Sequence, residues 1–214
     1  MDHRFFIEDL DIDLNSLSQW TIDLDSSIRS GQLDIGADSS LLDIYKDRSS
    51  GAGTALLEYY NIFNMGNADL DKLKNALNKN LKIACEYYGI DYNSKDWYLH
   101  GWFNRNAKDD LWDVSPIDHD DKWHEHMNGV GAPVFHGYFC VNAEPSVTVY
   151  QIFKNPENIK VNVNKNNRLV LSEVGHPHGM GNWRVDGDRI TIAYDIAPRE
   201  YISDDNAETW TRLN

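Results

Sequence analysis

Six short segments rich in β-branched and aromatic residues follow one another in the second half of the chain, and they constrain the fold more than any other feature. Glycine, asparagine, aspartate and proline separate the segments, which is typical of strands joined by turns. The expected strands are Trp97–Asn104, Pro133–Val141, Val147–Phe153, Lys160–Val163, Arg168–Ser172 and Arg189–Ile196. Many short strands of this kind close on themselves as a barrel or jelly roll. Residues 96–200 are therefore predicted to form a jelly-roll core.

The part of the chain before this core is predicted to be richer in helix and to pack outside it. Over Gly66–Tyr88, apolar residues recur at steps of three and four, as on one stripe of an amphipathic helix. Asn67 is a suitable N-cap for this helix, and Gly89 supplies its stop. A shorter helix is expected over Ala52–Phe63, and a first strand over Arg4–Ile7 with irregular acidic connections after it. The expected class is therefore α+β, mainly β.

The length of 214 residues predicts a single domain, with residues 1–95 as the helix-rich part, 96–200 as the core and 201–214 as a C-terminal tail. Twenty Lys and Arg against 34 Asp and Glu give a formal net charge of −14. Such a surface repels phosphate backbones and anionic lipids, which argues against a nucleic-acid or membrane binder. The acidic start does not resemble a signal peptide, so a cytoplasmic location is expected.

The two cysteines are too few for a disulfide framework. Cys85 lies on the apolar stripe of Gly66–Tyr88, and Cys140 lies in an aromatic, strand-like run. Both are predicted to be reduced, buried and unreactive thiols.

Six of the eight histidines lie between residues 119 and 178. Two groups have the i, i+2 spacing that puts both side chains on one face of a strand, His124-Glu125-His126 and His176-Pro177-His178. Such a pair can place two imidazoles on one metal ion, and a third ligand from a distant strand would complete a facial set with open positions. The same spacing also occurs without any metal, both in cores and on surfaces.

Other polar residues of this region have simpler interpretations. Glu125 points to the opposite face of its strand and is expected either to face solvent or to lie beside the metal ligands without binding the metal. His100 and His136 are predicted to be structural histidines rather than ligands. The acidic run at residues 118–121 is expected to be a solvated loop.

Arg189 begins the last expected strand and shares a face with Thr191, while the apolar residues at 190, 192, 194 and 196 share the other face. An arginine on the inner face of an apolar strand is costly unless it meets an anion. Its guanidinium can hold a carboxylate through two hydrogen bonds, and the Thr191 hydroxyl can donate to the same group. Because Arg189 follows His178 by 11 residues, a hairpin would bring both into one cavity. A structural salt bridge to one of the 34 acids is the alternative.

The order and spacing of these residues resemble the iron(II)- and 2-oxoglutarate-dependent oxygenases. The family pattern is His-x-Asp/Glu, a distal His roughly fifty residues on, and Arg-x-Ser/Thr about ten residues later. The stretch WHEHMNGVGAPVFHGYFCVNAEPSVTVYQIF is similar to the first part, and RLVLSEVGHPHGMGNWRVDGDRITIAYDI is similar to the second. The resemblance covers residues 97–198 and is strongest to oxygenases of bacteria and their viruses.

The resemblance implies a cupin-like double-stranded β-helix in which His124, His126 and His178 hold iron(II). His126 then stands at the family's carboxylate position, so this set lacks an anionic ligand. In the alternative register His126 is the first ligand and Asn128 takes the carboxylate position. Three imidazoles suit iron(II) better than two imidazoles and an amide. His176 is the less favoured distal ligand, because the residues around His178 fit the family better.

The resemblance also implies the cosubstrate 2-oxoglutarate, whose keto-acid end would chelate the iron. Arg189 and Thr191 would hold its far carboxylate, and Tyr138 and Tyr150 are candidates to line its pocket. Three tryptophans could line a substrate cleft, although packing in the core is the commoner role of such residues: Trp102, Trp123 and Trp183.

The implied activity is a dioxygenase that hydroxylates a small-molecule, peptide or protein substrate and releases succinate and carbon dioxide. One alternative is a cupin-like dioxygenase or isomerase with three histidines and no 2-oxoglutarate. The other is a non-enzymatic jelly-roll binding module in which the histidines are structural.

Overall fold

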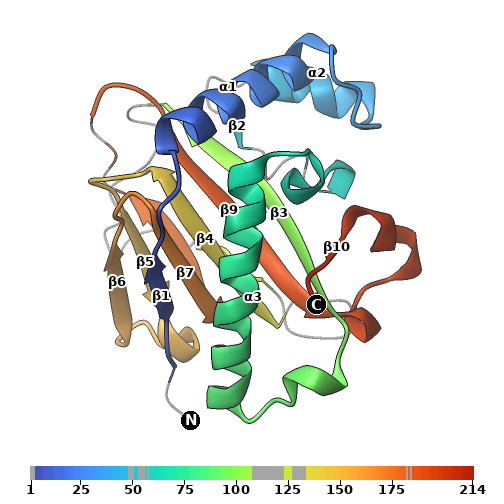
Figure 1. Cartoon of the computed structure of the whole chain (residues 1–214). Helices are drawn as coiled ribbons and strands as arrows, with labels where there is room; N and C mark the ends of the chain where they lie inside the picture. The colour runs from blue at the N-terminus through green and yellow to red at the C-terminus, as the bar shows by residue number, and fades with distance from the viewer. Residues whose placement is uncertain are drawn as a thin grey trace.

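Two antiparallel sheets face each other in the computed structural model, and helix α3 lies across the outer face of the larger sheet (Figure 1). The structure describes residues 3–47, 51–52, 56, 58–107, 123–126, 134–181, 183 and 185–214.

The larger sheet has seven strands in the order β1-β7-β4-β9-β3-β10, with β2 paired to β3. They are β1 (Phe6–Asp9), β2 (Gly51–Ala52), β3 (Trp97–Asn106), β4 (Phe135–Asn142), β7 (Arg168–Glu173), β9 (Arg189–Pro198) and β10 (Thr211–Arg212). The smaller sheet has the order β6-β5-β8, formed by β5 (Val147–Gln151), β6 (Ile159–Val163) and β8 (His178–Gly181). All the expected strands are present with bounds shifted by at most two residues, and the α+β class is confirmed.

Three α-helices and several short 3-10 turns complete the described elements. The helices are α1 (Leu14–Ser30), α2 (Ser39–Asp47) and α3 (Ala68–Tyr88). The turns are η2 (Ile62–Asn64), η3 (Tyr92–Ser94), η5 (Ile152–Lys154), η6 (Arg199–Tyr201) and η7 (Asp204–Thr209).

Helix α3 forms as its sequence predicts. The Asn67 side chain accepts the backbone N–H of Asp69 at 2.8 Å, and Gly89 ends the helix with φ of 69°. The buried stripe packs into the main core together with the inward apolar residues of the larger sheet. Its members are Leu70, Leu73, Leu77, Leu81, Ala84 and Cys85.

Helix α1 contradicts the expectation of irregular connections after the first strand. Asp13 caps it by accepting two backbone N–H groups. Its buried face carries Thr21 and Asp25 between leucine and isoleucine residues, so polar groups interrupt the apolar period that would have indicated a helix. The buried Asp25 carboxylate pairs with Arg29 one turn along the same helix and with two tertiary partners, Arg105 and the Tyr45 hydroxyl.

No continuous helix is seen in the described part of Ala52–Phe63, where one was expected, although residues 56, 58–59 and 62–63 have 3-10 conformation. Gly51–Ala52 pair with β3 as strand β2, and the segment ends in η2, which Asn61 caps. Pairing with the neighbouring strand, rather than local periodicity, decides the conformation of Gly51–Ala52.

Strand β9 divides the interior into two regions. Its residues Ile190, Ile192, Tyr194 and Ile196 belong to the main core on the helix side. Its residues Thr191, Ala193 and Asp195 line a cavity on the side of the smaller sheet. The alternation predicted for this strand is therefore confirmed.

The hairpin expected between His178 and Arg189 does not form. Strand β8, which begins at His178, belongs to the smaller sheet, whereas β9 belongs to the larger one. The chain crosses between the sheets after β8, so the two residues approach the interior from opposite walls.

Both cysteines are free and buried, as predicted. Burial raises the pKa of Cys85 to about 12 and that of Cys140 to about 11, which keeps both thiols protonated.

Candidate functional site

A cavity of about 520 Å³ lies between the two sheets. The larger sheet contributes Trp102 and Asn104 from β3, residues 136–138 from β4, and Thr191, Ala193 and Asp195 from β9. The smaller sheet contributes Thr148, His178 and Met180, and the described segment 123–126 adds His124, Glu125 and His126. Residues that lie far apart in the sequence therefore meet here on rigid strands.

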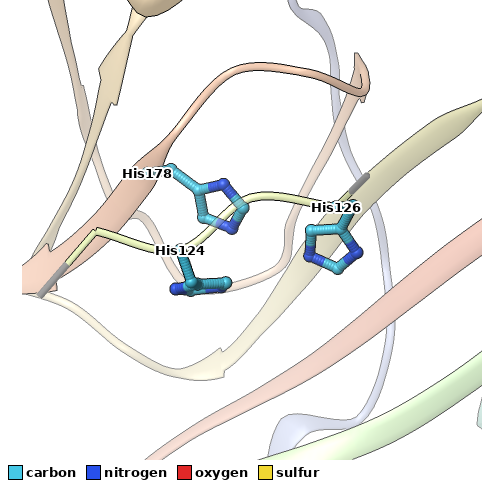
Figure 2. Close-up of side chains that lie close together, drawn as sticks. All are labelled: His124, His126 and His178. Carbon is cyan, nitrogen blue, oxygen red and sulfur yellow. The ribbon is translucent and has the colours of Figure 1, made fainter. Parts of the chain in front are cut away.

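Three histidines meet at this cavity (Figure 2). His124 joins the edge of β8 through two backbone hydrogen bonds with His178, of 3.1 and 2.8 Å. Each ring offers one nitrogen, and these nitrogens lie within 4.8 Å of one another for His124, His126 and His178. This is the set that the sequence predicts as metal ligands, and the structure brings its members together.

The other predicted histidine, His176, lies elsewhere. Its Nδ1 accepts the backbone N–H of Phe153 at 3.0 Å, so Nε2 carries the proton in the neutral ring and donates to Glu173 at 3.3 Å. His3 contacts the same carboxylate oxygen at 3.3 Å. The His176 ring is thus engaged in a hydrogen-bonded cluster and does not join the His124, His126 and His178 group.

His136 lies near the three histidines but does not belong to the group that could hold a metal ion, in agreement with the prediction that it is not a ligand. It is buried, yet it lines the cavity, and its ring centroid lies 4.6 Å from that of His126 and 4.7 Å from that of His178. The register decides this placement, because β4 lies beside β9 with His136 opposite Asp195. His100 lies on the other side of Asp195 and contacts the backbone oxygen of Tyr60 at 3.1 Å, in agreement with a structural role.

The environment keeps most of these imidazoles neutral. Burial, and next the other histidines, holds the pKa values of His136 and His178 well below the ordinary value of 6.5. Desolvation, followed by the charge of His126, lowers the pKa of His124 to about 4. A neutral imidazole has a free lone pair, which is the form that binds a metal ion.

His126 differs because it has an acidic neighbour. Its Nδ1 lies 2.7 Å from Oδ1 of Asp195, although the contact is too poorly aligned to complete a hydrogen bond at that oxygen. Burial alone would lower the pKa of His126, but the Asp195 carboxylate outweighs this effect and raises it. Asp195 was not predicted from the sequence. The alternation along β9 could have indicated it, because Asp195 lies an even number of residues from Arg189 and Thr191 and therefore shares their face of the strand.

Arg189 is fully buried at 0% exposure beside this cavity. Its Nε donates to the Ser146 hydroxyl at 2.9 Å, and Nη1 donates to the Thr191 hydroxyl at 3.4 Å. Nη2 has no hydrogen-bond partner, and no carboxylate of the described residues forms an ion pair with the guanidinium. Burial lowers the pKa of Arg189, since no anion compensates the charge. The alternative of a structural salt bridge is therefore not realised within the described part of the chain.

The two predicted pocket tyrosines take different places. Tyr138 lines the cavity, whereas Tyr150 is fully buried behind His178, with ring centroids 5.2 Å apart. Both hydroxyl oxygens are buried without a hydrogen-bond partner. Three buried polar groups in this region therefore lack a hydrogen-bond partner, namely the hydroxyls of Tyr138 and Tyr150 and Nη2 of Arg189.

Of the remaining predicted residues, some line the cavity and others do not. Trp102 lines the cavity, but Trp183 is buried with its indole N–H on the Gly187 oxygen at 3.1 Å. Glu125 forms an ion pair with Lys154 at 2.8 Å and also borders the cavity beside the histidine group, as one of its two predicted positions implies. Asn128 and the acidic run at 118–121 lie outside the described residues, so the register that uses Asn128 stays a prediction.

Comparisons with known proteins agree in the fold. HygX from Streptomyces hygroscopicus, solved with nickel and 2-oxoglutarate bound, aligns with 91% of this chain and 82% of its own at 13% identity and a TM-score of 0.50. SnoK, a non-heme α-ketoglutarate-dependent carbocyclase from nogalamycin biosynthesis, aligns with 99% of this chain and 88% of its own at 8% identity and a TM-score of 0.51. The chain has the fold of these two oxygenases. The predicted double-stranded β-helix is thereby confirmed.

At the level of sequence, no family model and no curated protein matches this chain. Among the described residues, no helix combines the length and the apolar character needed to span a membrane.

Proposed function

We propose that the protein is an iron(II)- and 2-oxoglutarate-dependent dioxygenase. The observation that carries this proposal is Arg189, a buried guanidinium with an unpartnered nitrogen and no acidic partner among the described residues. A buried positive charge of this kind is costly unless an anion binds to it. A dicarboxylate could bind Arg189 through one carboxylate and a metal ion at the histidine group through its other end.

The donor set fits a first-row divalent metal. His124, His126 and His178 supply three imidazole nitrogens, a ligand type that suits iron, and three protein ligands leave positions open for other molecules. When bound, iron(II) would supply the oxygen chemistry that couples decarboxylation of 2-oxoglutarate to succinate with oxidation of a substrate. We assign the three histidines the role of holding this ion.

The chain's own residues bind and orient the cosubstrate in this proposal. Arg189 and Thr191 bind the far carboxylate, and Ser146 fixes the guanidinium through its 2.9 Å hydrogen bond. Tyr138 offers its unpartnered hydroxyl within the cavity wall. Trp102 lies against the other end of the site, with its ring centroid 6.1 Å from that of His126.

The substrate is proposed to be a small molecule, a peptide or a protein side chain that enters beside Trp102 and Met180. The net charge of −14 disfavours nucleic acid and anionic lipid as partners.

The test is an anaerobic titration of the protein with iron(II) and 2-oxoglutarate. A weak visible absorption band is expected only when both are present, and succinate should form once oxygen and a suitable substrate are admitted. His178→Ala should lose the band because it lacks a ligand, and Arg168→Met is a control that removes an arginine far from the cavity. If calorimetry shows no binding of 2-oxoglutarate to the iron-loaded protein, the proposal is wrong.

A second candidate is a cupin-like dioxygenase or isomerase that uses no 2-oxoglutarate. The histidine group favours it, because the three nitrogens that lie together include no carboxylate. In this case Arg189 would bind the substrate itself. Substrate turnover without added 2-oxoglutarate and without succinate would identify this activity.

A further inference from the structure

We propose that Asp195 is a positioning residue that fixes the His126 ring and supplies the negative charge that a three-histidine metal set lacks. This inference rests on the proposed metal site of His124, His126 and His178. It assigns a role to a carboxylate that lies outside that set and inside the same cavity.

The contact between the two residues carries the inference. Asp195 Oδ1 lies 2.7 Å from Nδ1 of His126, so this carboxylate favours a proton on Nδ1 and leaves the lone pair of Nε2 for a metal ion. Histidines that bind metals commonly donate their other N–H to a carboxylate, which sets the orientation and raises the basicity of the ring. A small rotation of the ring would align the present contact as a hydrogen bond.

Asp195 acts through His126 and not as a ligand of the same ion. The group of donor atoms that lie within 4.8 Å of one another contains the three histidines but not Asp195. The carboxylate therefore reaches His126 without joining His124 and His178 in one coordination sphere.

The sheet holds Asp195 in place. It lies in the interior of β9, opposite His100 of β3 and opposite His136 of β4, so hydrogen-bonded strands flank it on both sides. Its side chain is 15% exposed, as is that of His126. The Asp195 carboxylate therefore has little room to move away from His126, whose Nδ1 lies 2.7 Å from its Oδ1.

The position of Asp195 next to His126 affects the charge around a bound metal ion. Three neutral imidazoles leave the full charge of a divalent ion uncompensated, whereas a set with a carboxylate ligand removes one unit of it. Asp195 adds one negative charge next to a ligand. The site thereby gains the charge of a carboxylate ligand while keeping three imidazole donors.

The test measures cobalt(II) binding to the full chain by its visible absorption, in competition with a chelator. Asp195→Ala should weaken binding about 10- to 100-fold, because both the orientation and the charge are lost. Asp195→Asn keeps an oxygen that accepts from Nδ1 and should fall between Asp195→Ala and the unchanged protein. Asp9→Asn removes one charge at the distant edge strand β1 and should leave binding unchanged.

A second measurement reads the His126 ring directly. Nitrogen-15 NMR at pH 8.5 without metal should show the proton on Nδ1 in the unchanged protein and a mixture of tautomers in Asp195→Ala. This readout does not depend on metal affinity, and it also reports whether the variant is folded.

The outcomes separate the two proposals. If the unchanged protein binds no cobalt(II), or if His178→Ala binds it equally well, the metal site and the proposed function are wrong. If His178→Ala abolishes binding but Asp195→Ala changes neither affinity nor tautomer, the role of Asp195 is wrong and the metal site stands. Complete loss of binding in Asp195→Ala with an unchanged tautomer would make Asp195 a ligand and would also overturn the positioning role.

Discussion

At the scale of single residues, Arg189 carries an energetic cost that its local contacts do not remove. Two of its nitrogens donate to the hydroxyls of Ser146 and Thr191, but Nη2 is buried without a partner. A buried polar group without a hydrogen bond costs about 1–3 kcal/mol in proteins. Arg189 therefore lowers the stability of the ligand-free protein and keeps a hydrogen-bond donor available for an anion.

Replacing Arg189 with Met should change stability and cosubstrate binding in opposite directions. The free energy of unfolding without ligand should rise by about 1–3 kcal/mol, because an uncompensated charge leaves the interior. Affinity for 2-oxoglutarate should fall roughly thirty-fold or more, as expected when one partner of a buried charge pair is removed. Urea unfolding and calorimetry measure the two effects, with Arg168→Met as the control. A destabilised variant with unchanged affinity would show that Arg189 is structural.

At the scale of elements, the close packing of β4 against its neighbours depends on a missing side chain. A Cβ built on Gly137 would lie 2.0 Å from the Val170 oxygen of β7 and 2.8 Å from the ring of Tyr194 on β9. The Tyr194 hydroxyl donates to the same Val170 oxygen at 2.8 Å. Glycine thus permits the approach that aligns β4, β7 and β9, and with them the cavity wall.

Gly137→Ala should destabilise the protein by about 1–3 kcal/mol or more, because the backbone must shift to relieve the overlap. Denaturant unfolding measures this loss. Ile83→Ala, at an exposed position of α3, should change the free energy of unfolding by less than about 0.5 kcal/mol. Equal stability of Gly137→Ala and the unchanged protein would contradict the close approach of these strands.

At the scale of the whole molecule, several buried histidines make stability depend on pH. Burial is the main cause that lowers the pKa values of His3, His136 and His178 below 6.5. The unfolded chain binds protons at these groups as the pH falls through 6.5, while the folded chain does not. Stability must therefore decrease as the pH falls below 6.5. His126 has the opposite effect on stability, because its raised pKa makes it stabilise the folded protein more at lower pH.

Urea unfolding at pH 8, 6.5 and 5, without added metal, should show a progressive loss of stability. Substituting His136 by Phe removes one of these groups and should make the decrease between pH 6.5 and 5 smaller. Stability that stays level or rises over this range would show that the histidines are not buried in neutral form.

A second acid-sensitive contribution should appear at lower pH. The hydrogen bonds from His176 and His3 outweigh burial and lower the pKa of Glu173 to about 2. A carboxylate with a lowered folded pKa stabilises the protein above its ordinary value of 4.5, and this contribution is lost as the pH falls toward 2. Glu173→Gln should therefore show a flatter pH dependence of stability between pH 4.5 and 2.

Local sequence determined the elements and the faces of their residues. The cap at Asn67, the stop at Gly89 and the leucine stripe between them specify α3, because each acts within a few residues along the chain. The alternation along β9 likewise assigned Arg189 and Thr191 to one face, since the period of a strand is two. Together with the order of the histidines, these patterns indicated the fold class and the candidate residues of the site.

Only the tertiary structure decided which of these residues meet, and with what partners. Strand order places His136 and Asp195 side by side, although 59 positions separate them in the sequence. An isolated antiparallel bridge brings His124 to His178, whereas His176 lies with His3 and Glu173. Such pairings depend on which strands lie side by side and on their register, whereas the period of two assigns each residue only to a face of its own strand. The absence of an acidic partner for Arg189 within the described residues is a property of the same kind, because it depends on every residue that packs around it.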